Sequence, residues 1–198
     1  MLSLSVCVMA APTAVPQVRI DAILKYVNDD FVSLLDVRQA RLLKLVDLSG
    51  SPTDNDVAMR IVERRLELAD IARTAPKPVT PQALQQRHAD WEASVGGAAK
   101  VPDLLRQAGM SEQDLDNWLR DDVRLQMYVD DVFLPRATPS RSEMLEYYQS
   151  NIAKYTKDGA VQTFDAVGAD VRRELRAANL AALVKSWADS LVRRAVVR

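Results

Sequence analysis

Helix-start signals recur along this chain, and they constrain its fold more than any other feature. At Thr53, Ser111 and Ser140, a hydroxyl residue is followed three positions later by Asp or Glu, which is the pattern of a capping box. Thr80-Pro81 adds an N-cap followed by proline at the first helical position. Glycines and prolines stand between these signals and end the preceding helices. The sequence therefore predicts a series of separate helices.

The spacing of apolar residues sets the extent of each predicted helix. The segments share a helical periodicity and differ in length, with no fixed-period similarity, so a solenoid is not expected. We expect helices over 34–48, 54–72, 81–95, 102–108, 112–133, from 141 onward, and 164–191, with a loop over 154–162.

Strand-like sequence is confined to the two ends. Val18–Val27 is rich in Ile, Val and Tyr and leads into turn residues, so it predicts a strand with Phe31-Val32-Ser33 as its hairpin partner. Val192–Arg198 is short and β-branched, and we expect it to pair with the first strand. The expected class is mostly α, an irregular multi-helix body with a small β element formed by N-terminal and C-terminal strands.

Composition excludes several classes of protein. The 198 residues fit one domain, and 26 Lys+Arg against 27 Asp+Glu give a net charge of −1, which speaks against a nucleic-acid binder. One Cys and one His exclude a disulfide scaffold and a conventional His/Cys zinc site. We expect no cofactor and no bound metal.

Residues 1–17 form an apolar, small-residue-rich leader without a basic n-region. Two interpretations stay open: a secretory signal whose true start lies upstream, or a disordered leader. The apolar run is too short to span a bilayer, so stable membrane insertion is not expected. Val6 precedes Cys7 where a lipobox needs a small residue, so Cys7 is expected to be an inert thiol.

No motif for catalysis occurs in the sequence. Patterns for a nucleophile elbow, a P-loop, a zinc protease and a dinucleotide fold are all absent. His88 shares a helix face with Leu84 and Trp91, which favours a packed position at the edge of the core. The acidic pairs, such as Asp121-Asp122, are expected on solvated helix faces because adjacent helical residues diverge by about 100°. The chain is therefore predicted not to be an enzyme.

Charge is uneven along the chain. The helix over 111–133 is acidic, whereas the stretch over 172–198 is basic. Attraction between the two elements, or solubility alone, is the simpler interpretation. The alternative is a basic rim for an acidic client or a membrane surface.

The order of five motifs resembles the SurA-type periplasmic chaperones. The opening Ile23–Arg38 is similar to the strand–turn–strand–helix start of that family, and Arg64–Ala72 to its second helix. Leu115–Tyr128 resembles a third helix, Ser140–Tyr155 the segment with Tyr147-Tyr148 followed by Asn151 and Tyr155, and Val171–Arg198 the closing helix and strand. The resemblance covers about Ile20 to Arg198, which we expect to form a single domain over 18–198 whose C-terminal part packs back on the N-terminal part.

One departure from the family matters for function. A parvulin-type prolyl isomerase domain usually lies between the Tyr-Tyr helix and the final helix, whereas here only residues 154–162 fill that position. The resemblance therefore implies the chaperone body without the isomerase. It implies ATP-independent holding of unfolded or outer-membrane-type polypeptides in the periplasm.

The expected client surface combines aromatic residues with adaptable methionines. Adjacent tyrosines cannot both face the core of one helix, so at least one is expected at the surface. The candidate client-binding residues are Trp118, Met127, Met144, Tyr147 and Tyr148. A scaffold that binds one folded partner and an isomerase remain alternatives, and a homodimer formed by swapped end segments stays open.

Overall fold

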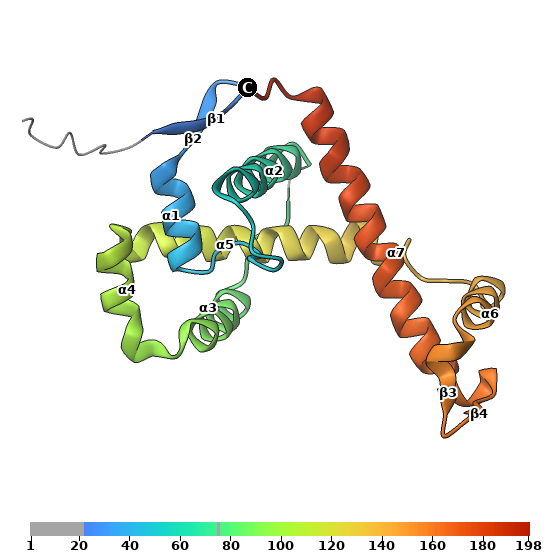
Figure 1. Ribbon diagram of the computed structural model, residues 1–198. Coiled ribbons are helices and arrows are strands. Elements are labelled where there is room, and N and C mark those ends of the chain that lie inside the picture. Colours follow the sequence, from blue (N-terminus) through green and yellow to red (C-terminus); the bar gives the residue numbers. More distant parts are fainter. Residues whose placement is uncertain (1–21, 75) are drawn as a thin grey trace, which may run out of the picture.

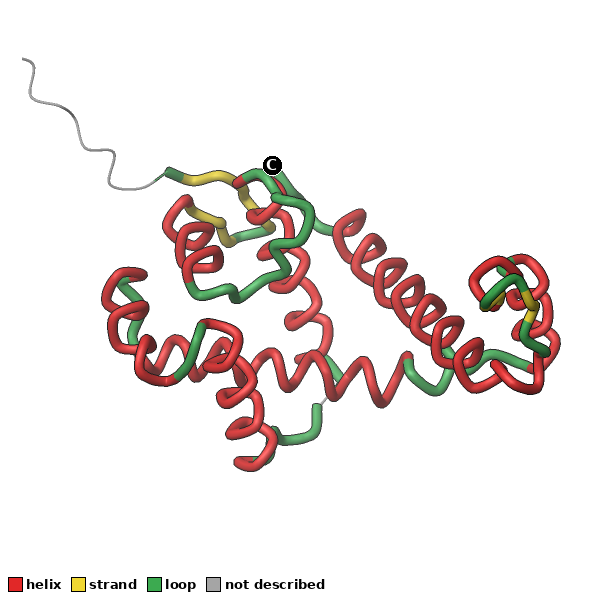
Figure 2. The backbone as a smooth tube through the Cα atoms, turned by 60° about the horizontal axis from the view of Figure 1, so that its bottom comes forward, coloured by secondary structure: helices red, strands yellow, loops and turns green. Residues whose placement is uncertain are grey.

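The computed structural model describes residues 22–74 and 76–198, most of which are helical (Figures 1 and 2). The leader over 1–17 and the beginning of the predicted first strand lie outside the described residues. The strands are β1 (Ile23–Val27), β2 (Asp30–Ser33), β3 (Thr156–Lys157) and β4 (Ala160–Val161). The helices are α1 (Leu34–Leu42), α2 (Asp54–Ala72), α3 (Pro81–Val95), α4 (Val101–Ala108), α5 (Glu112–Tyr128), α6 (Arg141–Ser150) and α7 (Phe164–Arg194). The mostly helical class is confirmed.

The predicted capping boxes are confirmed. The hydroxyl oxygens of Thr53, Ser111 and Ser140 each accept a backbone N–H three residues on, at 3.1–3.2 Å. A further box, between Ser33 and Asp36, starts α1. Each box satisfies N–H groups that the first helical turn leaves without partners. Local sequence therefore fixes where these helices begin.

Helices α1 to α5, the hairpin and the C-terminal end of α7 surround the main hydrophobic core, and together they are called the body here. Trp91 on α3 is the largest fully buried side chain, at 1% exposure. Its indole N–H donates to the carbonyl oxygen of Leu43 at 2.8 Å, so the one polar atom of the ring is satisfied inside the core.

Helix α1 ends at Leu42, earlier than the predicted residue 48. Leu43 and Leu45 are both buried, yet residues two positions apart on a helix point in nearly opposite directions. The chain therefore leaves the helix, with Lys44 at a φ of 51° and the Leu45 N–H donating to the Ala40 carbonyl at 2.9 Å. Tertiary packing overrides the helical periodicity here.

The predicted N-terminal hairpin is confirmed, whereas the predicted C-terminal strand over 192–198 is wrong. β1 and β2 pair antiparallel, with Tyr26 opposite Phe31. Helix α7 continues to Arg194 because Leu191 packs in the core as part of it. The few residues beyond make one bridge, Val197 to Val27, flanked by backbone hydrogen bonds such as Arg198 N–H to the Tyr26 carbonyl at 3.0 Å.

A second, smaller unit lies at the far end of α7 from the C-terminus (Figure 1). It comprises α6, β3, β4 and the N-terminal half of α7, and is called the outer lobe here. The predicted loop over 154–162 contains a 3-10 turn and the β3–β4 hairpin, whose turn residues Asp158 and Gly159 both have positive φ. Its separate core consists of Met144, Tyr148, Tyr155, Val167 and Val171.

Helix α7 joins the two units. Its 31 residues span about 46 Å at 1.5 Å per residue. Val171 is buried in the outer lobe and Ala188 in the body, and no residue of α7 between them is buried.

None of the helices in the described part of the chain is long and apolar enough to cross a bilayer.

Candidate functional site

An open groove of about 860 Å³ lies on the body between α3, α5 and the connection that follows α1. Its apolar lining combines buried and half-buried side chains, and polar and charged residues surround them. The apolar members are Leu45, Val46, Ala83, Val123, Leu125, Met127 and Val129, and the polar ones are Lys44, Asp47, Gln86, Arg87, Asp90, Asp122 and Gln126.

The connection after α1 forms one wall, and contacts with α3 hold it in place. The Leu43 carbonyl accepts the Trp91 indole N–H, and the Lys44 ammonium donates to the Ser94 carbonyl at 2.8 Å. Asp47 accepts hydrogen bonds from the backbone N–H and hydroxyl of Ser49, which lower the pKa of its exposed carboxyl. The first two contacts tie the wall to α3, and the Asp47–Ser49 contacts shape the connection itself.

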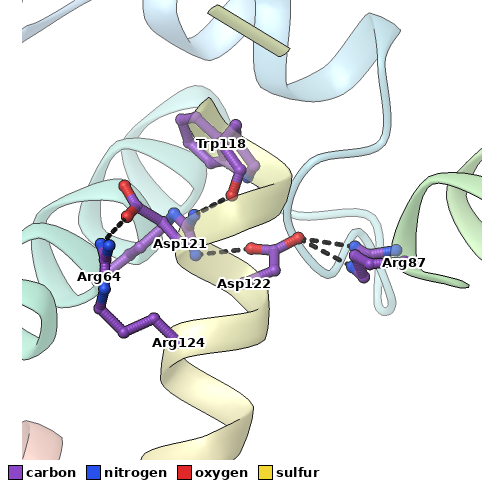
Figure 3. Close-up of polar contacts among 6 residues, drawn as sticks. All are labelled: Arg64, Arg87, Trp118, Asp121, Asp122 and Arg124. Atoms are coloured by element: carbon purple, nitrogen blue, oxygen red, sulfur yellow. Dashed lines mark hydrogen bonds and ion pairs between the residues drawn. The ribbon is translucent and has the colours of Figure 1, made fainter. Parts of the chain in front are cut away.

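Asp122 on α5, one of the residues that line the groove, connects three helices (Figure 3). One carboxylate oxygen pairs with Arg64 of α2 at 2.6 Å, and the other accepts two N–H groups of Arg87 of α3, at 2.7 and 3.1 Å. The Asp122 and Arg64 side chains are only 16% and 11% exposed. We call this cluster the Asp122 bridge; it fixes the spacing of α2, α3 and α5.

Arg64 also contacts the helix that carries its partner. Its guanidinium donates to the Trp118 carbonyl at 2.8 Å and lies over the Trp118 ring, 4.4 Å from the centroid. Burial lowers the pKa of Arg64, and the Asp122 carboxylate opposes that effect, so the side chain stays charged. Trp118 is therefore half-buried beneath a cation.

The charges around the groove nearly balance. Lys44 and Arg87 are positive, whereas Asp47, Asp90 and Asp122 are negative. No group of His, Cys, Asp and Glu side chains within 22–74 and 76–198 is arranged to hold a metal ion. Half-buried apolar side chains with mixed charges nearby can hold an apolar segment without selecting a particular charge.

The structure does not bring the five candidate client-binding residues together. Met127 lines the groove, and Trp118 lies on the same helix under Arg64. The other three belong to α6: Met144 and Tyr148 are buried in the outer-lobe core, and Tyr147 is half-buried. The Tyr147 hydroxyl donates to Glu174 at 3.2 Å and accepts from Lys154 at 3.0 Å.

The expectation of a solvated face is wrong for Asp122. Its position one turn after Trp118, on the core-facing side of α5, is the signal that it needs a cationic partner. The ion pairs of α5 go to α2, α3 and its own arginines, and none in the described residues reaches the basic C-terminal stretch. His88 is at the edge of the body and has a partner, Asp116, at 3.2 Å.

No protein-family model matches the chain, and no curated protein matches it in sequence.

Proposed function

We propose that this protein is an ATP-independent chaperone of the periplasm that holds unfolded polypeptides, including outer-membrane-type chains, and has no isomerase activity. The observation that carries the proposal is the open groove between α3, α5 and the connection after α1. Its volume of about 860 Å³ falls within the range of protein ligand sites.

The character of the groove suits a client of no fixed sequence. Leu125 and Met127 are half-buried, so they retain apolar surface for a client, and methionine adapts its shape to different partners. Ordering an unfolded segment costs conformational entropy, so each contact contributes little net affinity and release needs no ATP. Of the five candidate client-binding residues, Met127 is the one that lines the groove.

The outer lobe supports the absence of isomerase activity. Between Tyr155 and Thr163, where the chaperones that this sequence resembles carry the isomerase, the chain makes the two-residue strands β3 and β4 and a tight turn. A parvulin domain needs about 100 residues within the size range of compact domains, and this hairpin has no room for one.

The test is suppression of aggregation of an unfolded outer-membrane protein at a near-stoichiometric ratio. We expect the wild type to suppress aggregation and the double variant Leu125→Glu/Met127→Glu to lose most of that effect, because a bound apolar segment would bury the new carboxylates without partners. The control is Leu145→Glu, which places the same charge on an exposed leucine of α6.

Two outcomes would overturn the proposal. One is a wild-type protein that suppresses nothing but binds a single folded partner saturably, which identifies a scaffold. The other is prolyl isomerase activity comparable to that of a parvulin. Circular dichroism of each variant establishes that a loss of suppression does not come from unfolding.

A further inference from the structure

A second hollow, of about 370 Å³, lies along α7, away from the groove. It is formed by one face of α7 and by Leu134, which follows the π-helical turn Val129–Phe133 at the end of α5. Its lining joins four apolar side chains to three arginines and contains no acidic residue: Leu134, Ala169, Arg172, Arg173, Arg176, Ala177 and Leu180.

Two of these arginines lack an anionic partner in the described part of the chain. Arg173 pairs with Asp170 at 2.6 Å, whereas neither Arg172 nor Arg176 makes an ion pair within residues 22–74 and 76–198. The Arg176 Nε atom is buried and has no hydrogen-bond acceptor there. An incoming anion cannot reach this buried atom, but the terminal N–H groups of Arg172 and Arg176 make no ion pair within the described residues and can bind one in the hollow.

The wall opposite α7 is held in place. The Leu134 N–H donates to the Val129 carbonyl at 3.0 Å, and the Ala137 N–H to the Phe133 carbonyl at 3.0 Å. The Asn179 side chain on α7 donates to the Ala137 carbonyl at 3.3 Å, which joins the wall to the helix. The hollow is thus a formed feature of the fold.

We propose that this hollow binds the C-terminal residue of a polypeptide, with its apolar side chain against Leu134 and Leu180 and its α-carboxylate on Arg172 and Arg176. Arginine binds carboxylates in a two-pronged geometry that suits this role. The hollow is small, so one residue must supply both the anion and the apolar group. A C-terminal apolar residue carries both on the same Cα atom, whereas Asp and Glu lack the apolar side chain.

Charge argues against an anionic membrane as the occupant. Within Phe164–Leu180, three acidic residues, Asp165, Asp170 and Glu174, offset the three arginines. A membrane attracts proteins through a diffuse field, which responds to the summed charge of a surface and falls off within a Debye length. A single carboxylate at contact distance responds to the nearest guanidinium groups instead.

The test compares two peptides, Gly-Ser-Gly-Ala-Leu with a free C-terminal carboxylate and the same peptide with a C-terminal amide. Binding to the full chain is measured by fluorescence anisotropy. We expect the carboxylate peptide to bind about tenfold more tightly, as one charge-assisted hydrogen bond in place of a neutral one implies. Arg176→Gln should reduce that difference, because only Arg172 then remains to hold the carboxylate.

The matched control is Arg193→Gln, the same change on an exposed arginine of α7 outside the hollow, which should retain the difference between the peptides. Equal affinities for the two peptides in the wild type would overturn the proposal. So would an effect of Arg193→Gln equal to that of Arg176→Gln.

Two further arms identify the ligand. An amidated peptide ending in Glu should bind no better than the amidated Leu peptide, and binding of phosphatidylglycerol vesicles should not depend on Arg176. Either opposite result overturns the proposal in favour of an acidic side chain or a membrane. The groove variant Leu125→Glu/Met127→Glu should keep the carboxylate preference, so this site is tested independently of the chaperone proposal.

Discussion

The body and the outer lobe are stabilised in different ways. The body buries a core drawn from five helices, the hairpin and the end of α7, and the Asp122 bridge links three of those helices. The outer lobe buries only Met144, Tyr148, Tyr155, Val167 and Val171. Its tyrosines supply polar contacts, as the Tyr148 hydroxyl donates to the Gln162 carbonyl at 2.6 Å.

This difference indicates that the outer lobe is less stable than the body. Few buried apolar contacts are the mark of a region that opens locally before the whole protein unfolds. No residue of α7 between Val171 and Ala188 is buried, so the two hydrophobic cores are not continuous along the helix. A change of packing in one unit therefore has little effect on the other. The groove therefore lies on the more stable unit.

The largest expected effect is on the body. Asp122→Ala removes the shared carboxylate and leaves Arg64 mostly buried without its anion, so we expect a loss of about 3 kcal/mol in the free energy of unfolding. Urea denaturation followed by circular dichroism measures it. Arg87→Ala is the control and should cost less, because Arg87 is 32% exposed. A loss below about 1 kcal/mol for Asp122→Ala would mean that the bridge does not hold the body together.

A smaller effect is expected in the outer lobe. Val171→Ala deletes two fully buried methyl groups and should destabilise the lobe by about 2 kcal/mol. Hydrogen exchange should then speed up about 30-fold over α6 and the β3–β4 hairpin and stay unchanged over α2 and α5. Equal acceleration in both units would show that they unfold together and would end the distinction between them.

The smallest expected effect depends on pH. Burial, with the nearby Glu63 carboxylate, raises the pKa of Glu67 on α2 to about 7. Between the unfolded pKa near 4.5 and pH 7 the folded state holds a proton that the unfolded state has lost, so stability falls as pH rises. After allowance for solvent screening we expect a decline of about 1 kcal/mol.

Glu67→Gln should flatten this decline, as seen by urea denaturation at pH 5 and pH 8. The exposed Glu146→Gln on α6 is the control and should retain the wild-type slope. If both variants keep the slope, the pH dependence of the body comes from another group.

Features fixed by neighbouring residues could be predicted from the sequence. The boxes at Thr53, Ser111 and Ser140 start their helices through contacts that reach three residues along the chain. The end of α1 could not be predicted, because it depends on burying Leu43 and Leu45 against residues such as Trp91. A non-glycine residue with positive φ, here Lys44, gives no signal in the sequence.

The candidate site shows the same limit. Sequence placed Met127 correctly on a helix but could not place the connection after α1 opposite it. Met and Tyr occur both on client-binding surfaces and in protein cores. The burial of Met144 and Tyr148 in the fold shows that these two belong to a core. The ion pair between Asp122 and Arg64 joins helices that are far apart in the sequence, so the partner could not be predicted. The sequence indicates only that an acidic residue lies on an apolar helix face.

The bridge from Val197 to Val27 has a consequence for synthesis. Asn28 and Val196, which are 168 positions apart, are also hydrogen-bonded through the Asn28 side chain. A ribosome makes β1 early, yet the second edge of that strand stays uncovered until residues 196–198 emerge. The nascent body therefore exposes an open strand edge until residues 196–198 emerge, and the edge closes only after the described residues that precede them have left the exit tunnel.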